Sequence, residues 1–138
     1  MSRQEILDRL CREHQVLAVY LFGSRADDGL RLLNGEAVPV EGSDLDVGVV
    51  FRDPAIDFHR LASLQVGFED FFTPLRVDLV PLNRVDALFQ FAAIDGHRIA
   101  ATDSDVADDY ELRVMSRASE LLPIQRQLEI ERFGVSTT

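Results

Sequence analysis

The fold is decided by SDLDVGVVF, residues 43–51 of a 138-residue chain. Apart from its two acids this stretch is largely apolar, which predicts a buried β-strand from Asp44 to Phe51. Because side chains on a strand alternate between its two faces, Asp44 and Asp46 point the same way, with Cβ atoms roughly 6–7 Å apart. Aspartate is depleted in strands, so this pair favours a bound ligand over two solvated acids at a strand end.

A third acid, Asp78, lies in a second strand that we expect from Arg76 to Leu82. Three carboxylates on neighbouring strands repel one another unless something positive lies between them. Two divalent metal ions about 3.5–4 Å apart are the usual solution, and their usual chemistry is in-line displacement at phosphorus. Arg76 shares a face with Asp78, so a simple ion pair is the alternative for this acid alone; the three acids together favour a metal site.

The third feature is Gly23-Ser24, which follows an apolar run that predicts a strand over Val16–Phe22. We expect a turn from strand to helix here, with Ser24 as the N-cap. Such a turn lets the backbone and a helix N-terminus approach a phosphate closely. An ordinary capping turn is the alternative when the dipeptide is considered alone. Gly48 shares a face with the acids and is expected to leave the surface below them open.

Helical spacing predicts further helices over residues 3–14, 58–71, 85–94 and 105–133, and a weak strand over 98–101. Pro123 should break or kink the last helix near Leu122. Asn34-Gly35, between short apolar segments, predicts a β-hairpin inserted within residues 26–42. Residues 134–138 are expected to be a flexible tail. The whole chain, 1–138, is expected to form one α/β (α+β) domain with a mixed sheet.

Composition limits the class of protein. The net charge of −10 argues against direct binding of nucleic acid. The longest apolar runs are too short to span a bilayer, no secretion signal opens the chain, and Cys11 is the single cysteine, so we expect a cytoplasmic protein that does not contact a membrane. All fourteen basic residues are arginine, so any fixed cation at the site is an arginine. A second Asp-x-Asp, at residues 103–105, precedes a helix and is assigned to capping.

The ordered motifs LFGSR (21–25), SDLD (43–46) and VDLV (77–80) resemble the polymerase-β-type nucleotidyltransferase superfamily. More narrowly, the chain resembles the minimal nucleotidyltransferases that act as antitoxins of HEPN toxins in prokaryotic toxin–antitoxin modules. The resemblance implies a palm-like core that transfers a nucleoside monophosphate, AMP from ATP, with two Mg²⁺ ions. The stretch from Arg25 to Ser43 is longer than is common in that family.

The resemblance also implies roles for six residues. Asp44 and Asp46 would hold both metal ions, and Asp78 would bind the ion that activates the acceptor hydroxyl. Gly23 and Ser24, with Arg25, would bind the β- and γ-phosphates of the nucleotide.

Three functions remain open at this stage. The first is an antitoxin enzyme that adenylylates a tyrosine of its cognate HEPN toxin. The second is a non-catalytic antitoxin that neutralises the toxin by stoichiometric binding, which the acidic charge suits if the toxin is basic. The third is nucleotidyl transfer to a small molecule with the help of a partner chain.

Overall fold

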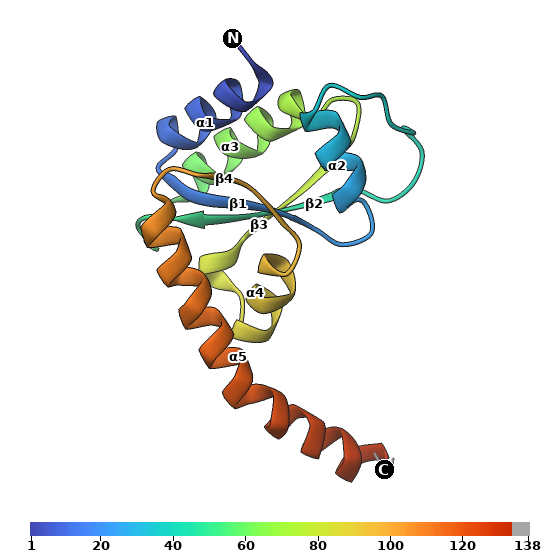
Figure 1. The fold of residues 1–138 in the computed structure, drawn as a ribbon, viewed down its shortest axis with the longest axis vertical. Helices are drawn as coiled ribbons and strands as arrows, with labels where there is room; N and C mark the ends of the chain where they lie inside the picture. The colour runs from blue at the N-terminus through green and yellow to red at the C-terminus, as the bar shows by residue number, and fades with distance from the viewer. Residues whose placement is uncertain (134–138) are drawn as a thin grey trace.

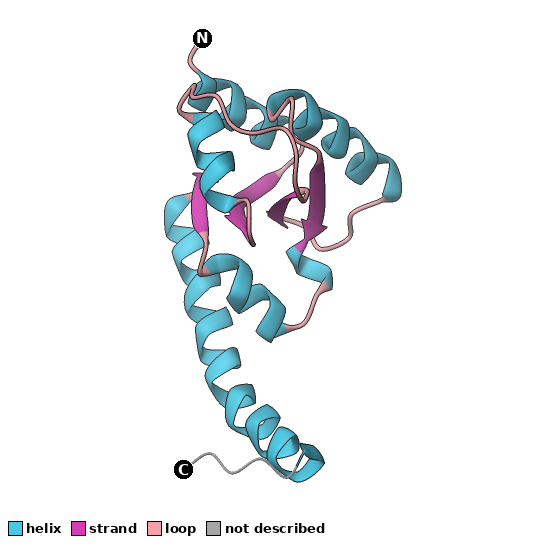
Figure 2. Cartoon of the chain, turned by 90° about the vertical axis from the view of Figure 1, so that its right-hand side faces the viewer, coloured by secondary structure: helices cyan, strands magenta, loops and turns pink. Residues whose placement is uncertain are grey.

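A four-stranded mixed sheet lies between two groups of helices in the computed structural model, which describes residues 1–133 (Figures 1 and 2). The strand order is β3-β2-β1-β4; β1 is antiparallel to β2 and β4, whereas β2 and β3 are parallel. The strands are β1 (Val16–Phe22), β2 (Leu45–Phe51), β3 (Val77–Pro81) and β4 (His97–Ala101). The mixed α/β sheet expected from the sequence is confirmed. The tail predicted at 134–138 lies outside the described residues.

The helices divide between the two faces of the sheet (Figure 1). Side chains of the first three pack with one hydrophobic cluster, and those of the last two pack with a second cluster on the opposite face. The first group is α1 (Arg3–Glu13), α2 (Ala26–Leu33) and α3 (Phe58–Phe71). The second group is α4 (Ala87–Ile94) and α5 (Ser104–Phe133), and a short 3₁₀ turn, Leu82–Arg84, follows β3.

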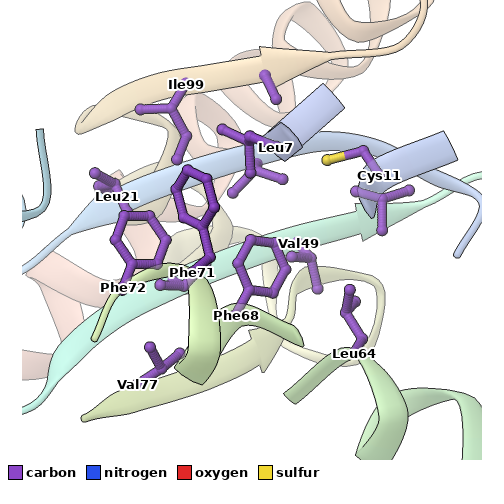
Figure 3. Close-up of a cluster of buried hydrophobic side chains, with 14 of the residues drawn as sticks. Leu7, Cys11, Leu21, Val49, Leu64, Phe68, Phe71, Phe72, Val77 and Ile99 are labelled. Atoms are coloured by element: carbon purple, nitrogen blue, oxygen red, sulfur yellow. The ribbon is translucent and has the colours of Figure 1, made fainter. Parts of the chain in front are cut away.

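The larger core lies where α1 and α3 meet the sheet (Figure 3). Phe68 and Phe72 are fully buried there, with ring centroids 6.2 Å apart. Cys11 joins the same cluster, and its burial raises the pKa of the thiol to about 12. The thiol is therefore protonated at neutral pH and acts as a packing group. On the other face, the buried Tyr20 hydroxyl donates to Glu111 at 2.7 Å.

The hairpin predicted within residues 26–42 is wrong, because residues 26–33 form helix α2. Its apolar residues Ala26, Leu30 and Leu33 recur at helical spacing and pack against the larger core. Asn34-Gly35 ends this helix: Asn34 is the C-cap and Gly35 has a φ of +83°. An Asn-Gly pair serves a helix C-terminus as well as a tight hairpin, because both need a residue with positive φ.

The last helix, α5, continues through Pro123, so of the break or kink predicted near Leu122 the break does not occur. Its axis bends in the second half, where the helix leaves the body of the protein (Figure 1). The Asp103 carboxylate accepts from the Val106 N–H at 3.2 Å, which confirms the predicted capping role for Asp103, and Asp105 lies in the first turn of the helix. None of the helices within residues 1–133 combines the length and the apolar character needed to cross a membrane.

Gly96 provides a test of the fold between α4 and β4. A Cβ added there would overlap the carbonyl oxygen of Leu21 in the neighbouring strand, and backbone cannot move aside as a flexible side chain can. We expect Gly96→Ala to lower the free energy of unfolding by about 3 kcal/mol in urea denaturation. Gly35→Ala is the control: nothing lies within 4 Å of its added Cβ, so only the positive φ is strained, at about 1 kcal/mol. Equal losses for the two variants would contradict this account.

Candidate active site

Three acids meet where β2 and β3 begin. The parallel register places Asp46 directly beside Asp78, with Leu45 beside Val77 one position earlier. Leu45 and Val77 are buried in the larger core, so the two acids point to the opposite face, toward α4 and α5. Asp44 lies just before β2 and is exposed, as is Asp78, whereas Asp46 is half-buried. The structure thus brings together the three acids that the sequence predicts.

The surroundings of the Asp46 carboxyl group disfavour its ionised form. Burial, followed by the charge of Asp78, a hydrogen bond with Asp78 and the charge of Asp44, raises the pKa of Asp46 above its ordinary value. Each cause disfavours the ionised form of Asp46. A cation bound among these acids would act in the opposite direction and stabilise the charged form.

Gly23 and Ser24 stand beside these acids at the end of β1. Phe22 pairs with Asp46 in the β1–β2 register, so Gly23 follows directly. A Cβ on Gly23 would overlap the Asp46 carboxylate, and its φ of +74° also suits glycine. The predicted N-cap role of Ser24 is wrong: α2 has Arg25 as its N-cap, and the Ser24 hydroxyl is hydrogen-bonded to the Ser43 hydroxyl at 2.9 Å. This bond joins the Gly-Ser turn to the residue that precedes Asp44.

Arg25 has a structural role that the sequence did not reveal. Its side chain is buried, and Nε donates to Asp28 at 3.1 Å. The remaining donors bind the loop before β2, at the carbonyl oxygens of Pro39, Glu41 and Ser43. The guanidinium is therefore engaged by the protein itself, and the expectation that Arg25 binds phosphate is not supported. It fixes the loop that leads into Asp44 instead.

The surface beneath the acids is closed. A Cβ on Gly48 would lie 3.0 Å from Leu82, so Leu82 already fills the space that we expected Gly48 to leave open. Glycine is needed here because of the close approach of Leu82. On the α4 side, Phe22 and Phe89 form an edge-to-face pair with centroids 5.8 Å apart. The surface beneath the acids is therefore apolar, because Leu82 fills it, and the aromatic pair of Phe22 and Phe89 lies on the α4 side.

The three acids suit a hard divalent cation, because carboxylate oxygens are the ligands that Mg²⁺ prefers. The raised pKa of Asp46 indicates that its carboxyl lies close to the other two. Within residues 1–133, however, no three His, Cys, Asp or Glu side chains converge as a complete metal-binding group. The chemistry of the three carboxylates nevertheless fits Mg²⁺.

A small polar pocket of about 190 Å³ lies between the approaches to β2 and β3. Its lining includes Glu41, Asp44 and Arg76. Arg76 is exposed and forms no ion pair or side-chain hydrogen bond with any residue in the described part of the chain, so the alternative of an Arg76–Asp78 ion pair is wrong. A larger groove of about 370 Å³, between α1 and α3, lies away from the acids.

Comparison with protein families identifies the fold and its chemistry. The family model described as polymerase beta, nucleotidyltransferase, matches residues 4–105, which include all three acids and the Gly-Ser turn. The chain belongs to this nucleotidyltransferase family. The resemblance inferred from the motifs is thereby confirmed. A search of curated proteins gave no match to this nucleotidyltransferase.

Solved structures share the fold over nearly the whole chain. A MntA–HpeT toxin–antitoxin structure is 19% identical, with a TM-score of 0.67 over 98% of this chain and 100% of that chain. The complex of tri-AMPylated Shewanella oneidensis HEPN toxin with MNT antitoxin is 17% identical, with a TM-score of 0.64 over 96% and 97%. A toxin–antitoxin structure with AMP-PNP is 20% identical, with a TM-score of 0.65 over 96% and 98%.

The crowding around Asp46 predicts a gain in stability when its charge is removed. A carboxyl whose pKa is raised on folding stabilises the folded state at low pH, and this contribution is lost as the pH rises through the raised value. Asp46→Asn should therefore raise the thermal midpoint by about 3 °C at pH 7 in EDTA. The gain should disappear as the pH falls through the raised pKa and the wild-type carboxyl becomes protonated. Asp109→Asn, an exposed acid on α5, is the control; an equal gain in the control would contradict the explanation.

The buried Arg25 predicts a loss of loop order. Arg25→Met leaves three loop carbonyl oxygens without their donor, and we expect the free energy of unfolding to fall by about 2 kcal/mol. Limited proteolysis should cut residues 36–43 faster in this variant than in the wild type. Arg31→Met removes an exposed arginine from the same helix and should leave both measurements unchanged. Unaltered proteolysis of Arg25→Met would show that the loop is held by other contacts.

Proposed function

We propose that this nucleotidyltransferase transfers AMP from Mg²⁺-bound ATP to a tyrosine hydroxyl of a cognate HEPN toxin, and so acts as a cytoplasmic antitoxin. The observation that carries the proposal is the arrangement of the acids. Asp46 and Asp78 share a register position, Asp44 stands two residues before Asp46, and the Gly23 backbone packs against Asp46. This combination supports a phosphate-binding turn beside a site for divalent cations.

Each residue has a defined task in this reaction. Asp44 and Asp46 would hold two Mg²⁺ ions, and Asp78 would complete the site on the acceptor side. Bound metal ions neutralise charge on the phosphates and help the acceptor hydroxyl to lose its proton. Gly23 and Ser24 would hold the β- and γ-phosphates through the backbone and the hydroxyl. Arg25 acts indirectly, since it fixes the loop that carries Ser43 toward Ser24.

The bonds made and broken are those of a phosphoryl transfer. The tyrosine oxygen attacks the α-phosphorus, the bond from the α-phosphorus to the bridging oxygen breaks, and pyrophosphate leaves with the electron pair of that bond. The hydroxyl proton passes to solvent. Positioning and charge neutralisation provide most of the catalysis in such a reaction.

The proposed partner rests on the solved structures rather than on geometry. Nearly the whole chain matches structures of toxin–antitoxin pairs, one of which contains a tri-AMPylated HEPN toxin. At identities below 25% this likeness shows the fold, so the partner and the acceptor remain part of the proposal. The net charge of −10 also supports a second candidate, stoichiometric binding of a basic toxin without transfer.

The deciding experiment is label transfer from α-³²P-ATP with Mg²⁺ to the product of an adjacent toxin-like gene. We expect Asp44→Asn and Asp46→Asn to reduce transfer at least 1,000-fold, about 4 kcal/mol of transition-state stabilisation. EDTA should have the same effect on the wild type. Asp109→Asn, which alters an exposed acid in the first part of α5, should transfer normally.

Complex formation and toxin neutralisation are measured in parallel. Full neutralisation by both acid variants, with no label from the wild type, would favour the binding function. Label transfer that survives both substitutions would contradict the metal-site assignment.

A further inference from the structure

The proposed reaction assigns no role to Arg76. It occupies the position just before β3, two residues ahead of Asp78 and on the same face. Its own carbonyl oxygen accepts from the Leu45 N–H at 2.8 Å, and its side chain shares a pocket with Asp44. Its acidic neighbours are therefore Glu41 and Asp44 in the pocket and Asp78 two residues along the chain.

The guanidinium nevertheless pairs with none of these carboxylates. Within residues 1–133, Arg76 forms no ion pair and no side-chain hydrogen bond. Instead, its side chain helps to line the polar pocket of about 190 Å³, together with Asp44 and the 40–43 loop. With Arg25 engaged by that loop and no lysine in the chain, Arg76 is the cation that this side of the site offers to a ligand.

The strand order indicates which ligand approaches Arg76. Gly23 and Ser24 end β1, the acids of β2 stand in the middle, and Asp78 and Arg76 belong to β3 on the far side. In-line displacement requires the attacking and leaving oxygens to lie on opposite sides of the phosphorus. If the leaving phosphates lie at Gly23 and Ser24, the acceptor must arrive over β3, beside Arg76.

The pocket wall is held in place before any ligand arrives. Arg25 donates to the carbonyl oxygens of residues 39, 41 and 43, which are spread along the loop that forms one side of the pocket. Gly42, within this loop, has a φ of +128°, and its Cβ position lies 3.2 Å from the Arg25 guanidinium. A buried, bonded support of this kind favours a defined recognition site over a flexible loop.

We propose that the pocket beside Arg76 receives the acceptor segment, and that Arg76 binds a carboxylate next to the acceptor hydroxyl. This inference rests on the proposed function. A planar guanidinium matches a carboxylate in a two-point hydrogen bond, which makes it a specific reader of this group. The net charge of −10 otherwise repels an acidic segment, so Arg76, which is unpaired within residues 1–133, has a selective effect.

The test separates acceptor recognition from nucleotide binding. Initial rates of label transfer are measured while the partner protein and MgATP are varied in turn. We expect Arg76→Gln to raise the KM for the partner about 10-fold and to leave the KM for MgATP within about twofold of the wild type. Arg76→Lys should recover only part of the loss, because it keeps the charge but not the two-point geometry. Arg12→Gln, which removes an exposed arginine from α1, is the matched control and should leave both KM values unchanged.

Two further measurements keep the inference independent of catalytic rate. Titration calorimetry in the Asp46→Asn background should show the same 10-fold loss of partner affinity when Arg76→Gln is added. After mass spectrometry locates the labelled residue, replacing the partner's nearby acids by amides should raise the KM similarly. In the Arg76→Gln background these replacements should have no further effect.

Each contrary result has a distinct meaning. An unchanged partner KM and affinity with Arg76→Gln would overturn the assignment while the proposed function stands. A rise in the KM for MgATP would place Arg76 on the nucleotide side and also overturn it. If the wild type neither labels nor binds the partner, the proposed function fails, and the role of Arg76 fails with it.

Discussion

The parallel register between β2 and β3 is the constraint on which the site depends. It sets Asp46 beside Asp78 while Leu45 and Val77, one residue earlier, lie in the core. A slip of one residue would turn Asp78 into that core and bring an apolar side chain to the site. The hydrophobic packing of the neighbouring positions therefore determines where the charges lie, and the same packing keeps three mutually repelling acids together.

Close packing around the acids limits what each nearby position can be. The carboxylate of Asp46 occupies the space where Gly23 would carry a Cβ, and Leu82 occupies the corresponding space at Gly48. The two glycines thus bring the backbone of β1 and the chain after β3 against the acidic strand. The result is a closely packed surface beneath the acids, consistent with chemistry that depends on preorganised charge.

The sequence predicted the strands and the acids because long apolar runs and alternating faces leave few choices. It failed where one local signal serves two structures: Asn34-Gly35 suits a hairpin turn and a helix end equally well. It also failed where a role depends on distant residues. Ser24 bonds to Ser43, and the guanidinium of Arg25 is buried against a loop 14 to 18 positions away. Neither contact has a signature in local spacing.

The clamp made by Arg25 has an evolutionary consequence. It binds residues 39, 41 and 43 of the α2–β2 connection directly from the start of α2, so helix α2 and the last part of this connection are fixed to each other. Residues between them can then be gained or lost without displacing the acidic strand, since lengthening a surface loop costs little free energy. The stretch before Asp44 is thus a place where the surface can change in shape while the acidic strand keeps its position.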